Sequence, residues 1–146
     1  MSRRPAFIRI GSSVRVVMVS DSSERERRRI LIVEDEPLIA WALADMVREI
    51  GHEGLGPVAT EKAAVEEAAR LAPDAIVMDF RLAAGGSGLA AAHRIRETAS
   101  VPIIFCTAYA EEAGLRAEML SVPRSALIAK PVFRANLERA LEQLLK

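Results

Sequence analysis

Short apolar runs in this chain repeatedly end in a polar side chain that could take part in chemistry. The polar residues at these positions are Glu34, Asp35, Asp79, Thr107 and Lys130. If the runs are neighbouring parallel strands, their carboxyl ends meet at one sheet edge and these side chains lie together. Carboxylates suit a hard divalent cation such as Mg²⁺, and a carboxylate can accept a phosphoryl group to form an aspartyl phosphate. The set therefore predicts a metal site with Asp79 as the acceptor.

The acidic residues divide between metal binding and phosphoryl acceptance. We expect Asp35 and Asp79 to bind Mg²⁺ directly, and Glu34 to bind it directly or through water. The backbone carbonyl of Arg81 is a candidate for a further oxygen ligand. A bound metal neutralises the negative charge that would otherwise repel a phosphoryl donor. The alternative, a group of solvated acids at strand ends, does not explain why a hydroxyl and an ammonium group follow the other runs.

Three backbone or side-chain donors can contact the phosphoryl group. The Thr107 hydroxyl can donate to a phosphoryl oxygen, and the Ala108 N–H can donate to another. Lys130 supplies a mobile positive charge, and it is one of three lysines beside seventeen arginines. Bonds before proline are mostly trans, so the prediction of a cis peptide between Lys130 and Pro131 depends on a resemblance to a known family.

The apolar runs alternate with segments of helical periodicity from residue 30 onward. Strands are predicted at 30–33, 53–59, 75–79, 102–106 and 125–129. Helices are predicted at 37–50, 60–71, 89–98, 110–120 and 133–145. Alternating strands and helices predict right-handed crossovers and a parallel sheet that is covered on both faces. We therefore predict an α/β fold with a doubly wound five-stranded parallel sheet of order 2-1-3-4-5, flavodoxin-like and of the (βα)5 type. Its site is expected where the strand order switches, between Glu34 and Asp79.

Residues 1–28 differ in composition from the rest, and we predict that they form a mostly disordered arm before a domain at 29–146. Residues 1–29 carry eight arginines and three acidic residues, a balance of +5, whereas the remainder has a balance of −5. In one alternative, the segment 14–19 forms a strand, although Arg15 interrupts it. In another, translation starts at Met18, which the mass of the native N-terminus would decide.

Bulk properties exclude several classes of protein. Net charge is zero and residues 30–146 are mildly acidic, so we expect no nucleic acid partner. No apolar run approaches transmembrane length, so we expect a cytoplasmic protein with no membrane partner. Cys106 and Trp41 are interpreted as packing residues, and His52 and His93 as surface or packing residues. No output domain follows the last helix, so we expect a stand-alone protein.

The motifs together resemble those of a response-regulator receiver domain. They are Glu34-Asp35-Glu36-Pro37, the strand ending in Asp79, Thr107-Ala108 and Lys130-Pro131, in receiver order and spacing. The resemblance covers about residues 29–146. It implies that Asp79 accepts a phosphoryl group from a sensor histidine kinase or phosphotransfer protein in a bacterial two-component phosphorelay, with Glu34 and Asp35 holding Mg²⁺. It also implies that Thr107 and Lys130 sense the phosphoryl group, that an unknown downstream protein responds, and that the chain is a monomer or weak dimer.

Several positions depart from the common receiver pattern. Ala83 stands where many receivers have proline, and Leu127 stands where many have tyrosine or phenylalanine. Tyr109, two residues after Thr107, could replace that missing ring as part of the switch or shield the phosphoryl group from water. The segment 105–109 resembles an atypical alphaproteobacterial receiver subgroup that often works with kinases of the HWE type.

Two other functions compete with the phosphorylated switch. One is a receiver-like module that binds proteins without phosphorylation, which the intact set of acids, Thr107 and Lys130 disfavours. The other is a Mg²⁺-dependent phosphatase that works through an aspartyl intermediate. Such an enzyme needs a second acid for proton transfer, and Arg81 stands two residues after Asp79 where that acid would be expected. We therefore expect a signalling protein and not an enzyme.

Overall fold

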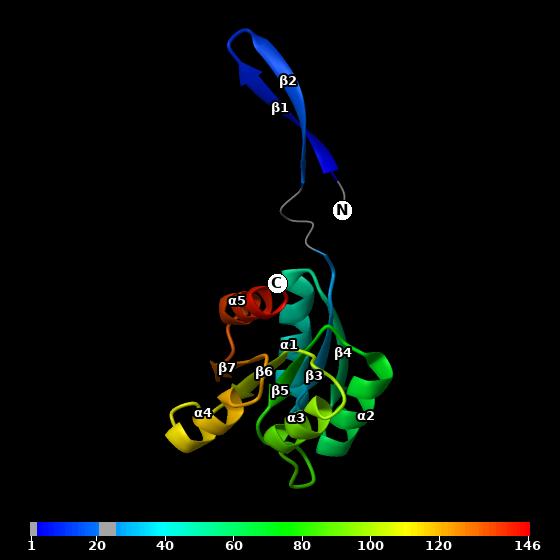
Figure 1. The fold of residues 1–146 in the computed structure, drawn as a ribbon, viewed down its shortest axis with the longest axis vertical. Coiled ribbons are helices and arrows are strands. Elements are labelled where there is room, and N and C mark those ends of the chain that lie inside the picture. Colours follow the sequence, from blue (N-terminus) through cyan, green and yellow to red (C-terminus); the bar gives the residue numbers. More distant parts are fainter. Residues whose placement is uncertain (1–2, 21–25) are drawn as a thin grey trace.

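Five parallel strands form the central sheet of the computed structural model, which describes residues 3–20 and 26–146. They are β3 (Arg29–Val33), β4 (Glu53–Val58), β5 (Ala75–Asp79), β6 (Ile103–Thr107) and β7 (Ser125–Ala129). Their order in the sheet is β4-β3-β5-β6-β7. Counted from β3, this is 2-1-3-4-5, so the predicted topology is confirmed (Figure 1).

Helices alternate with these strands at nearly the predicted boundaries. They are α1 (Pro37–Ile50), α2 (Glu61–Leu71), α3 (Gly88–Arg96), α4 (Ala113–Leu120) and α5 (Arg134–Leu144). Gly51 ends α1 in the left-handed region at φ 105°, which glycine adopts without steric cost. The Thr60 hydroxyl accepts a hydrogen bond of 3.0 Å from the Ala63 N–H and caps α2, as the sequence predicts. None of the described helices combines the length and apolar character needed to cross a membrane.

Two hydrophobic clusters lie on opposite faces of the sheet. Alternate residues of a strand point to opposite faces, so Ile30 and Ile32 join one cluster while Leu31 and Val33 join the other. The first cluster contains side chains from α1 and α5, and the second contains side chains from α2, α3 and α4. This two-sided burial explains why the strands are continuously apolar. Cys106 is buried in the first cluster, as predicted.

The N-terminal segment differs from the expected disordered arm. β1 (Arg3–Ile10) and β2 (Ser13–Ser20) pair as an antiparallel hairpin that forms a separate two-stranded sheet. Figure 1 shows this hairpin standing apart from the five-stranded sheet. The alternative reading of 14–19 as a strand thus agrees with the structure, and Arg15 is accommodated because both faces of the hairpin are open to solvent.

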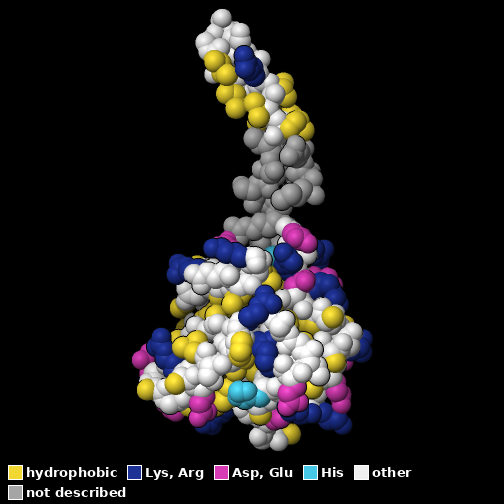
Figure 2. Space-filling model, viewed as in Figure 1, with side chains coloured by type: hydrophobic (Ala, Val, Ile, Leu, Met, Phe, Trp, Pro, Cys, Tyr) yellow, Lys and Arg dark blue, Asp and Glu magenta, His cyan; other side chains and the backbone are white. Residues whose placement is uncertain are grey.

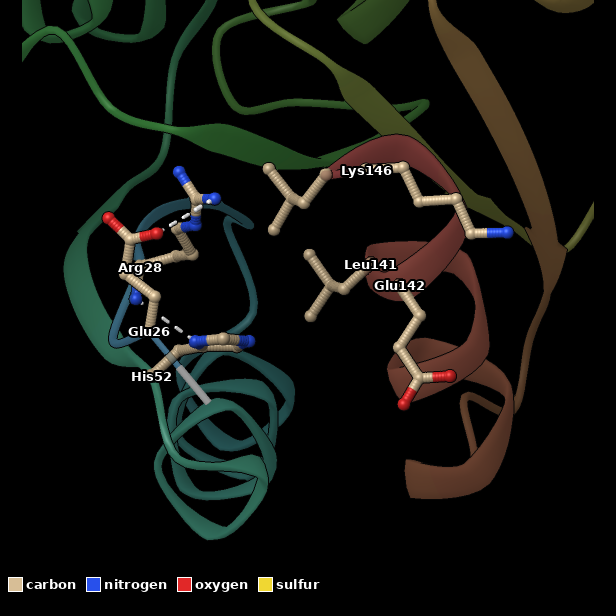
Figure 3. Close-up of a pocket in the computed structure, with 7 residues that line it drawn as sticks. Glu26, Arg28, His52, Leu141, Glu142 and Lys146 are labelled. Atoms are coloured by element: carbon tan, nitrogen blue, oxygen red, sulfur yellow. Dashed lines mark hydrogen bonds and ion pairs between the residues drawn. The ribbon is translucent and has the colours of Figure 1, made fainter. Parts of the chain in front are cut away.

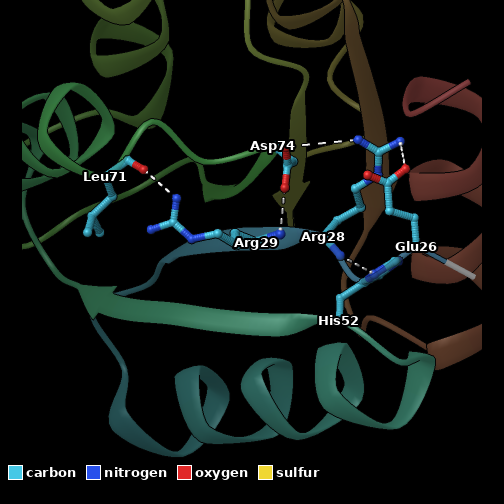
Figure 4. Close-up of polar contacts among 6 residues, drawn as sticks. All are labelled: Glu26, Arg28, Arg29, His52, Leu71 and Asp74. Atoms are coloured by element: carbon cyan, nitrogen blue, oxygen red, sulfur yellow. Dashed lines mark hydrogen bonds and ion pairs between the residues drawn. The ribbon is translucent and has the colours of Figure 1, made fainter. Parts of the chain in front are cut away.

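Polar contacts fix the point where the chain enters the central sheet (Figure 4). The Arg29 N–H donates to an Asp74 carboxylate oxygen at 2.8 Å, and its guanidinium donates to the Leu71 carbonyl at 2.7 Å. The Arg28 N–H donates to Nδ1 of His52, which is buried, at 3.0 Å. These bonds tie the start of β3 to residues beside the starts of β4 and β5, at the edge opposite the predicted site.

Candidate functional site

The sheet order brings the carboxyl ends of β3, β5, β6 and β7 to one edge. Glu34 directly follows β3, Asp79 ends β5 and Thr107 ends β6, and all three side chains are buried. Lys130 directly follows β7, and its Nζ lies 3.0 Å from Asp79 Oδ1 and 3.5 Å from Glu34 Oε2. The structure therefore brings together side chains that are far apart in the sequence, as the strand-end pattern predicts.

The acidic side chains are close enough to share one cation. Ligand oxygens of Glu34, Asp35 and Asp79 all lie within 4.8 Å of one another. Both Glu34 carboxylate oxygens are buried and have no hydrogen-bond partner within the described residues, since the contact with Lys130 Nζ is a longer ion pair. A buried carboxylate without such partners is costly, and a hard cation with oxygen ligands would satisfy it. The donor set thus fits Mg²⁺.

The environment of Glu34 shifts its proton affinity. Burial, followed by the neighbouring Asp79 carboxyl group, raises the pKa of Glu34 from 4.5 to about 7, although Lys130 acts in the opposite direction. The pKa of the Lys130 ammonium lies above its ordinary value. Burial lowers that pKa, but the contacts with Asp79 and Glu34 outweigh it. Lys130 therefore stays charged while Glu34 takes up a proton near neutral pH.

Backbone contacts hold Lys130 beside Thr107. The Lys130 N–H donates to the Thr107 carbonyl at 2.9 Å, and the Lys130–Pro131 peptide is cis. The Thr107 hydroxyl oxygen accepts from the Tyr109 N–H at 2.9 Å. That bond uses an acceptor position of the hydroxyl, so its proton is available for a phosphoryl oxygen.

Side chains from the loops after β5 and β6 meet beside the acids. The Arg81 guanidinium carbon lies 4.5 Å from the centroid of the Tyr109 ring, a cation–π contact. Phe80 meets the same ring edge-on, with centroids 6.0 Å apart and planes at 64°. Tyr109 therefore joins the residues that follow Asp79 to those that follow Thr107.

The backbone after Asp79 contributes two features that the sequence analysis did not predict. The Phe80 N–H donates to Asp79 Oδ1 at 2.8 Å and helps fix the carboxylate. Gly88, the first residue of α3, packs so closely that an added Cβ would lie 1.9 Å from the Asp79 carbonyl oxygen. The sequence alone does not indicate this contact, because a glycine needed for close approach looks the same in sequence as one needed for a turn.

Three predicted site features stay predictions. No contact among the described residues bears on the roles of the Ala108 N–H or the Arg81 carbonyl. Leu127 pairs with Phe105 in the sheet and packs against the cluster on the α2, α3 and α4 face. The assignment of Leu127 to the switch, at the position where many receivers have an aromatic residue, therefore rests on the family pattern alone.

An apolar groove lies next to Lys130, between α1 and the segment after β7. Its volume is about 490 Å³. Its lining comprises Leu38, Ile39, Ala42, Leu43, Met46, Lys130, Pro131 and Val132. Leu38 is 84% exposed, and Trp41, one turn further along α1, is 66% exposed. The interpretation of Trp41 as a packing residue is therefore wrong, because most of its side chain is exposed to solvent.

A second hollow lies at the opposite edge of the sheet (Figure 3). Figure 3 shows Glu26, Arg28 and His52 on one side of it, and Leu141, Glu142 and Lys146 on the other. Its volume is about 190 Å³. It contains none of the predicted site residues.

Comparison with known sequences points to one family. Residues 30–142 match the model of the response regulator receiver domain. The chain is 42% identical over 119 residues to the phyllosphere-induced regulator PhyR of Methylorubrum extorquens, in an alignment covering 80% of this chain and 43% of PhyR. It is 33% identical over 123 residues to the transcriptional regulatory protein PdtaR of Mycobacterium tuberculosis, covering 84% of this chain and 59% of PdtaR. The chain thus spans about half the length of these curated relatives.

Solved structures agree with the sequence matches. PhyR of Brucella abortus superposes with a TM-score of 0.74 at 32% identity, covering 84% of this chain and 49% of that chain. The receiver domain of the sensor histidine kinase PA1611 of Pseudomonas aeruginosa, with a magnesium ion coordinated in its active site cleft, gives a TM-score of 0.72 at 36% identity. That alignment covers 82% of this chain and 98% of the other.

Proposed function

Because the chain belongs to the response regulator receiver domain family, we propose that it is a phosphorylated switch in two-component signalling. Asp79 accepts a phosphoryl group from a sensor histidine kinase or a phosphotransfer protein, and the modified protein changes its binding to a downstream protein. The observation that carries this proposal is the position of the Lys130 ammonium, 3.0 Å from Asp79 Oδ1 and beside Glu34. The setting of the reaction would be the cytoplasm.

The proposed step is transfer of a phosphoryl group from nitrogen to oxygen. An Asp79 carboxylate oxygen attacks phosphorus while the P–N bond of a phosphohistidine breaks, and the imidazole leaves with the electron pair and takes a proton. Mg²⁺, held by Glu34, Asp35 and Asp79, would neutralise part of the charge on the transferred group. Lys130 would exchange its ion pair with Asp79 for one with a phosphoryl oxygen.

Hydrogen-bond donors from β6 would hold the new group. The Thr107 hydroxyl proton can turn to a phosphoryl oxygen while its oxygen still accepts from the Tyr109 N–H. Moving Thr107 would pull on Tyr109, whose ring contacts Arg81 and Phe80. Through these contacts, phosphorylation of Asp79 would change the conformation of the surface formed by residues 107–130.

The apolar groove beside α1 is the proposed approach of the phosphodonor. Leu38 lines this groove and is exposed, and the groove extends to Lys130 and Pro131. A histidine on a helix that docks its apolar face in this groove would reach Asp79 from the open side of the sheet edge. The same proposal includes a donor kinase of the HWE type, which rests on the resemblance of the segment 105–109 to the receiver subgroup that often works with such kinases.

The first experiment is the mass of the intact protein after incubation with a small acyl-phosphate donor and Mg²⁺. We expect the gain of one phosphoryl group, which should be absent in Asp79→Asn and in a sample with chelated metal. A gain that persists in Asp79→Asn would contradict the assignment of the acceptor. A folded protein that gains nothing from any donor would instead support a module that binds proteins without phosphorylation.

A further inference from the structure

The N-terminal hairpin carries an exposed apolar surface that the receiver chemistry does not use. Figure 2 shows hydrophobic side chains in a row along the hairpin. The larger exposed ones are Phe7 at 72%, Val16 at 59%, Val14 at 57%, Ile10 at 56% and Met18 at 52%. A two-stranded hairpin is at best marginally stable alone in water. So much exposed apolar area indicates a surface that is covered when the protein works.

Strand register shows that this surface is organised by face. Residues directly opposite in an antiparallel pair lie on the same face, and Phe7 pairs with Val16, Arg9 with Val14 and Pro5 with Met18. Because alternate residues share a face, these three pairs form one surface, apolar except for Arg9. The other face carries Arg15, opposite Ile8. Each face therefore combines apolar side chains with an arginine near the turn.

The charges on the hairpin are all of one sign. Residues 1–20 contain four arginines and no aspartate or glutamate, whereas residues 30–146 have a balance of −5. A partner that contacts apolar residues and arginines together must offer both hydrocarbon and negative charge. Nucleic acid offers charge but little hydrocarbon surface, and pairing two hairpins would bring eight arginines together with no acid.

We propose that the hairpin of residues 3–20 binds the surface of a membrane containing anionic lipids. Phe7, Val16 and Met18 would enter the boundary between headgroups and acyl chains, and Arg9 would contact lipid phosphates. The negatively charged α/β part would stay away from the bilayer. The contact is at the surface, in keeping with the absence of a membrane-spanning helix in the described residues. This proposal replaces the expectation of no membrane partner, because the exposed hairpin is not evident from the sequence.

The experiment is flotation of the full chain with vesicles of phosphatidylcholine alone and of phosphatidylcholine mixed with phosphatidylglycerol. We expect binding to the mixed vesicles, little binding to the neutral ones, and weakening by salt. The double variant Arg9→Gln/Arg15→Gln should bind about 30-fold more weakly, since each arginine contributes separately. Phe7→Ser/Val16→Ser, which removes one apolar pair, should also reduce binding.

The matched control is Arg116→Gln/Arg139→Gln, which removes two exposed arginines from the α/β part and should bind like the parent. Equal binding to neutral vesicles would overturn the electrostatic part of the proposal. Loss of binding in the control would place the contact outside the hairpin and overturn it entirely. No binding to either vesicle, with a mass that doubles as concentration rises, would show that a second copy covers the hairpin instead.

Discussion

Glu34 is a buried carboxyl group that gains protons on folding. Its pKa is raised from 4.5 to about 7 by burial and by Asp79. Between these values the native protein holds a proton that the unfolded chain has released, so the free energy of unfolding falls as pH rises through this window. Below about pH 4.5, Glu34 is protonated in both the native and the unfolded state, so it causes no loss of stability.

Without metal, the melting temperature should therefore fall between pH 4.5 and 7 by more in the parent than in Glu34→Gln, whose amide does not titrate. Circular dichroism melts across this range measure the difference. Mg²⁺ should reduce the pH dependence of the parent, because a bound cation compensates the charge of ionised Glu34. Equal slopes for parent and Glu34→Gln would contradict this assignment.

Gly88 tests how tightly the backbone packs beneath Asp79. A Cβ on Gly88 would overlap the Asp79 carbonyl oxygen, so Gly88→Ala should destabilise the protein by about 1–3 kcal/mol through overpacking. It should also slow phosphorylation, because the acceptor must move. The control is Gly114→Ala in α4, where a Cβ meets nothing within 4 Å and stability should rise by up to about 1 kcal/mol. Urea denaturation compares the two, and similar effects at both positions would show that the close approach at Gly88 does not matter.

At the scale of elements, the loops after β5 and β6 are joined through Tyr109. Its ring contacts Arg81 and Phe80, which lie directly after Asp79. If this contact shields the phosphoryl group from water, Tyr109→Ala should lose the group several-fold faster than the parent, while Tyr109→Phe should keep most of the lifetime. The decay of the phosphorylated mass after donor removal measures both. An unchanged decay in Tyr109→Ala would leave the ring with a packing role only.

Variants on the surface of helix α1 can distinguish docking of a protein donor from the chemistry at Asp79. Because Trp41 is mostly exposed, Trp41→Ala should change stability by no more than about 0.5 kcal/mol. Phosphotransfer from a histidine kinase or phosphotransfer protein should slow about tenfold or more, as for an aromatic anchor of an interface. Phosphorylation by a small acyl phosphate should be unaffected. Arg48→Ala, at the far end of the same helix, is the control, and a loss with the small donor would argue against docking.

Most elements of the α/β part follow from local patterns in the sequence. The strands at 30–33 and 75–79 are unbroken aliphatic runs, and Thr60 and Gly51 mark helix ends by their own chemistry. The prediction that Trp41 packs in the core was wrong because helical periodicity identifies an apolar face but does not show which residues at its margin are buried by other elements. The strand Arg3–Ile10 was missed because Pro5 and three arginines disfavour a strand, and only pairing with β2 makes it one.

At the scale of the whole molecule, the site is predictable because topology collects strand ends at one edge. The distance of 3.0 Å between Lys130 Nζ and Asp79 Oδ1 and the contacts of the Tyr109 ring with Arg81 and Phe80 are not predictable in the same way. They depend on loop conformations that no local pattern specifies. The close approach of Gly88 to Asp79 belongs to the same class, since it joins two segments through tertiary packing.

The hairpin and the α/β part should differ strongly in stability. Amides of β1 and β2 pair only with each other, whereas those of β3 and β5 lie inside a sheet buried on both faces. Hydrogen exchange should be about 1,000-fold faster or more in the hairpin than in β3 and β5. Mass spectrometry of peptides from both regions measures this. Equal protection would show that the hairpin is stabilised by a contact with another molecule.

The exposed position of Trp41 gives the protein a built-in optical reporter. It is the only tryptophan in the chain, and its indole is already in contact with water in the folded state. Its emission should therefore change little when the core unfolds. A partner that covers α1 would remove water from the ring and shift the emission to shorter wavelength, so fluorescence of the unlabelled protein would report docking nearly free of interference from unfolding.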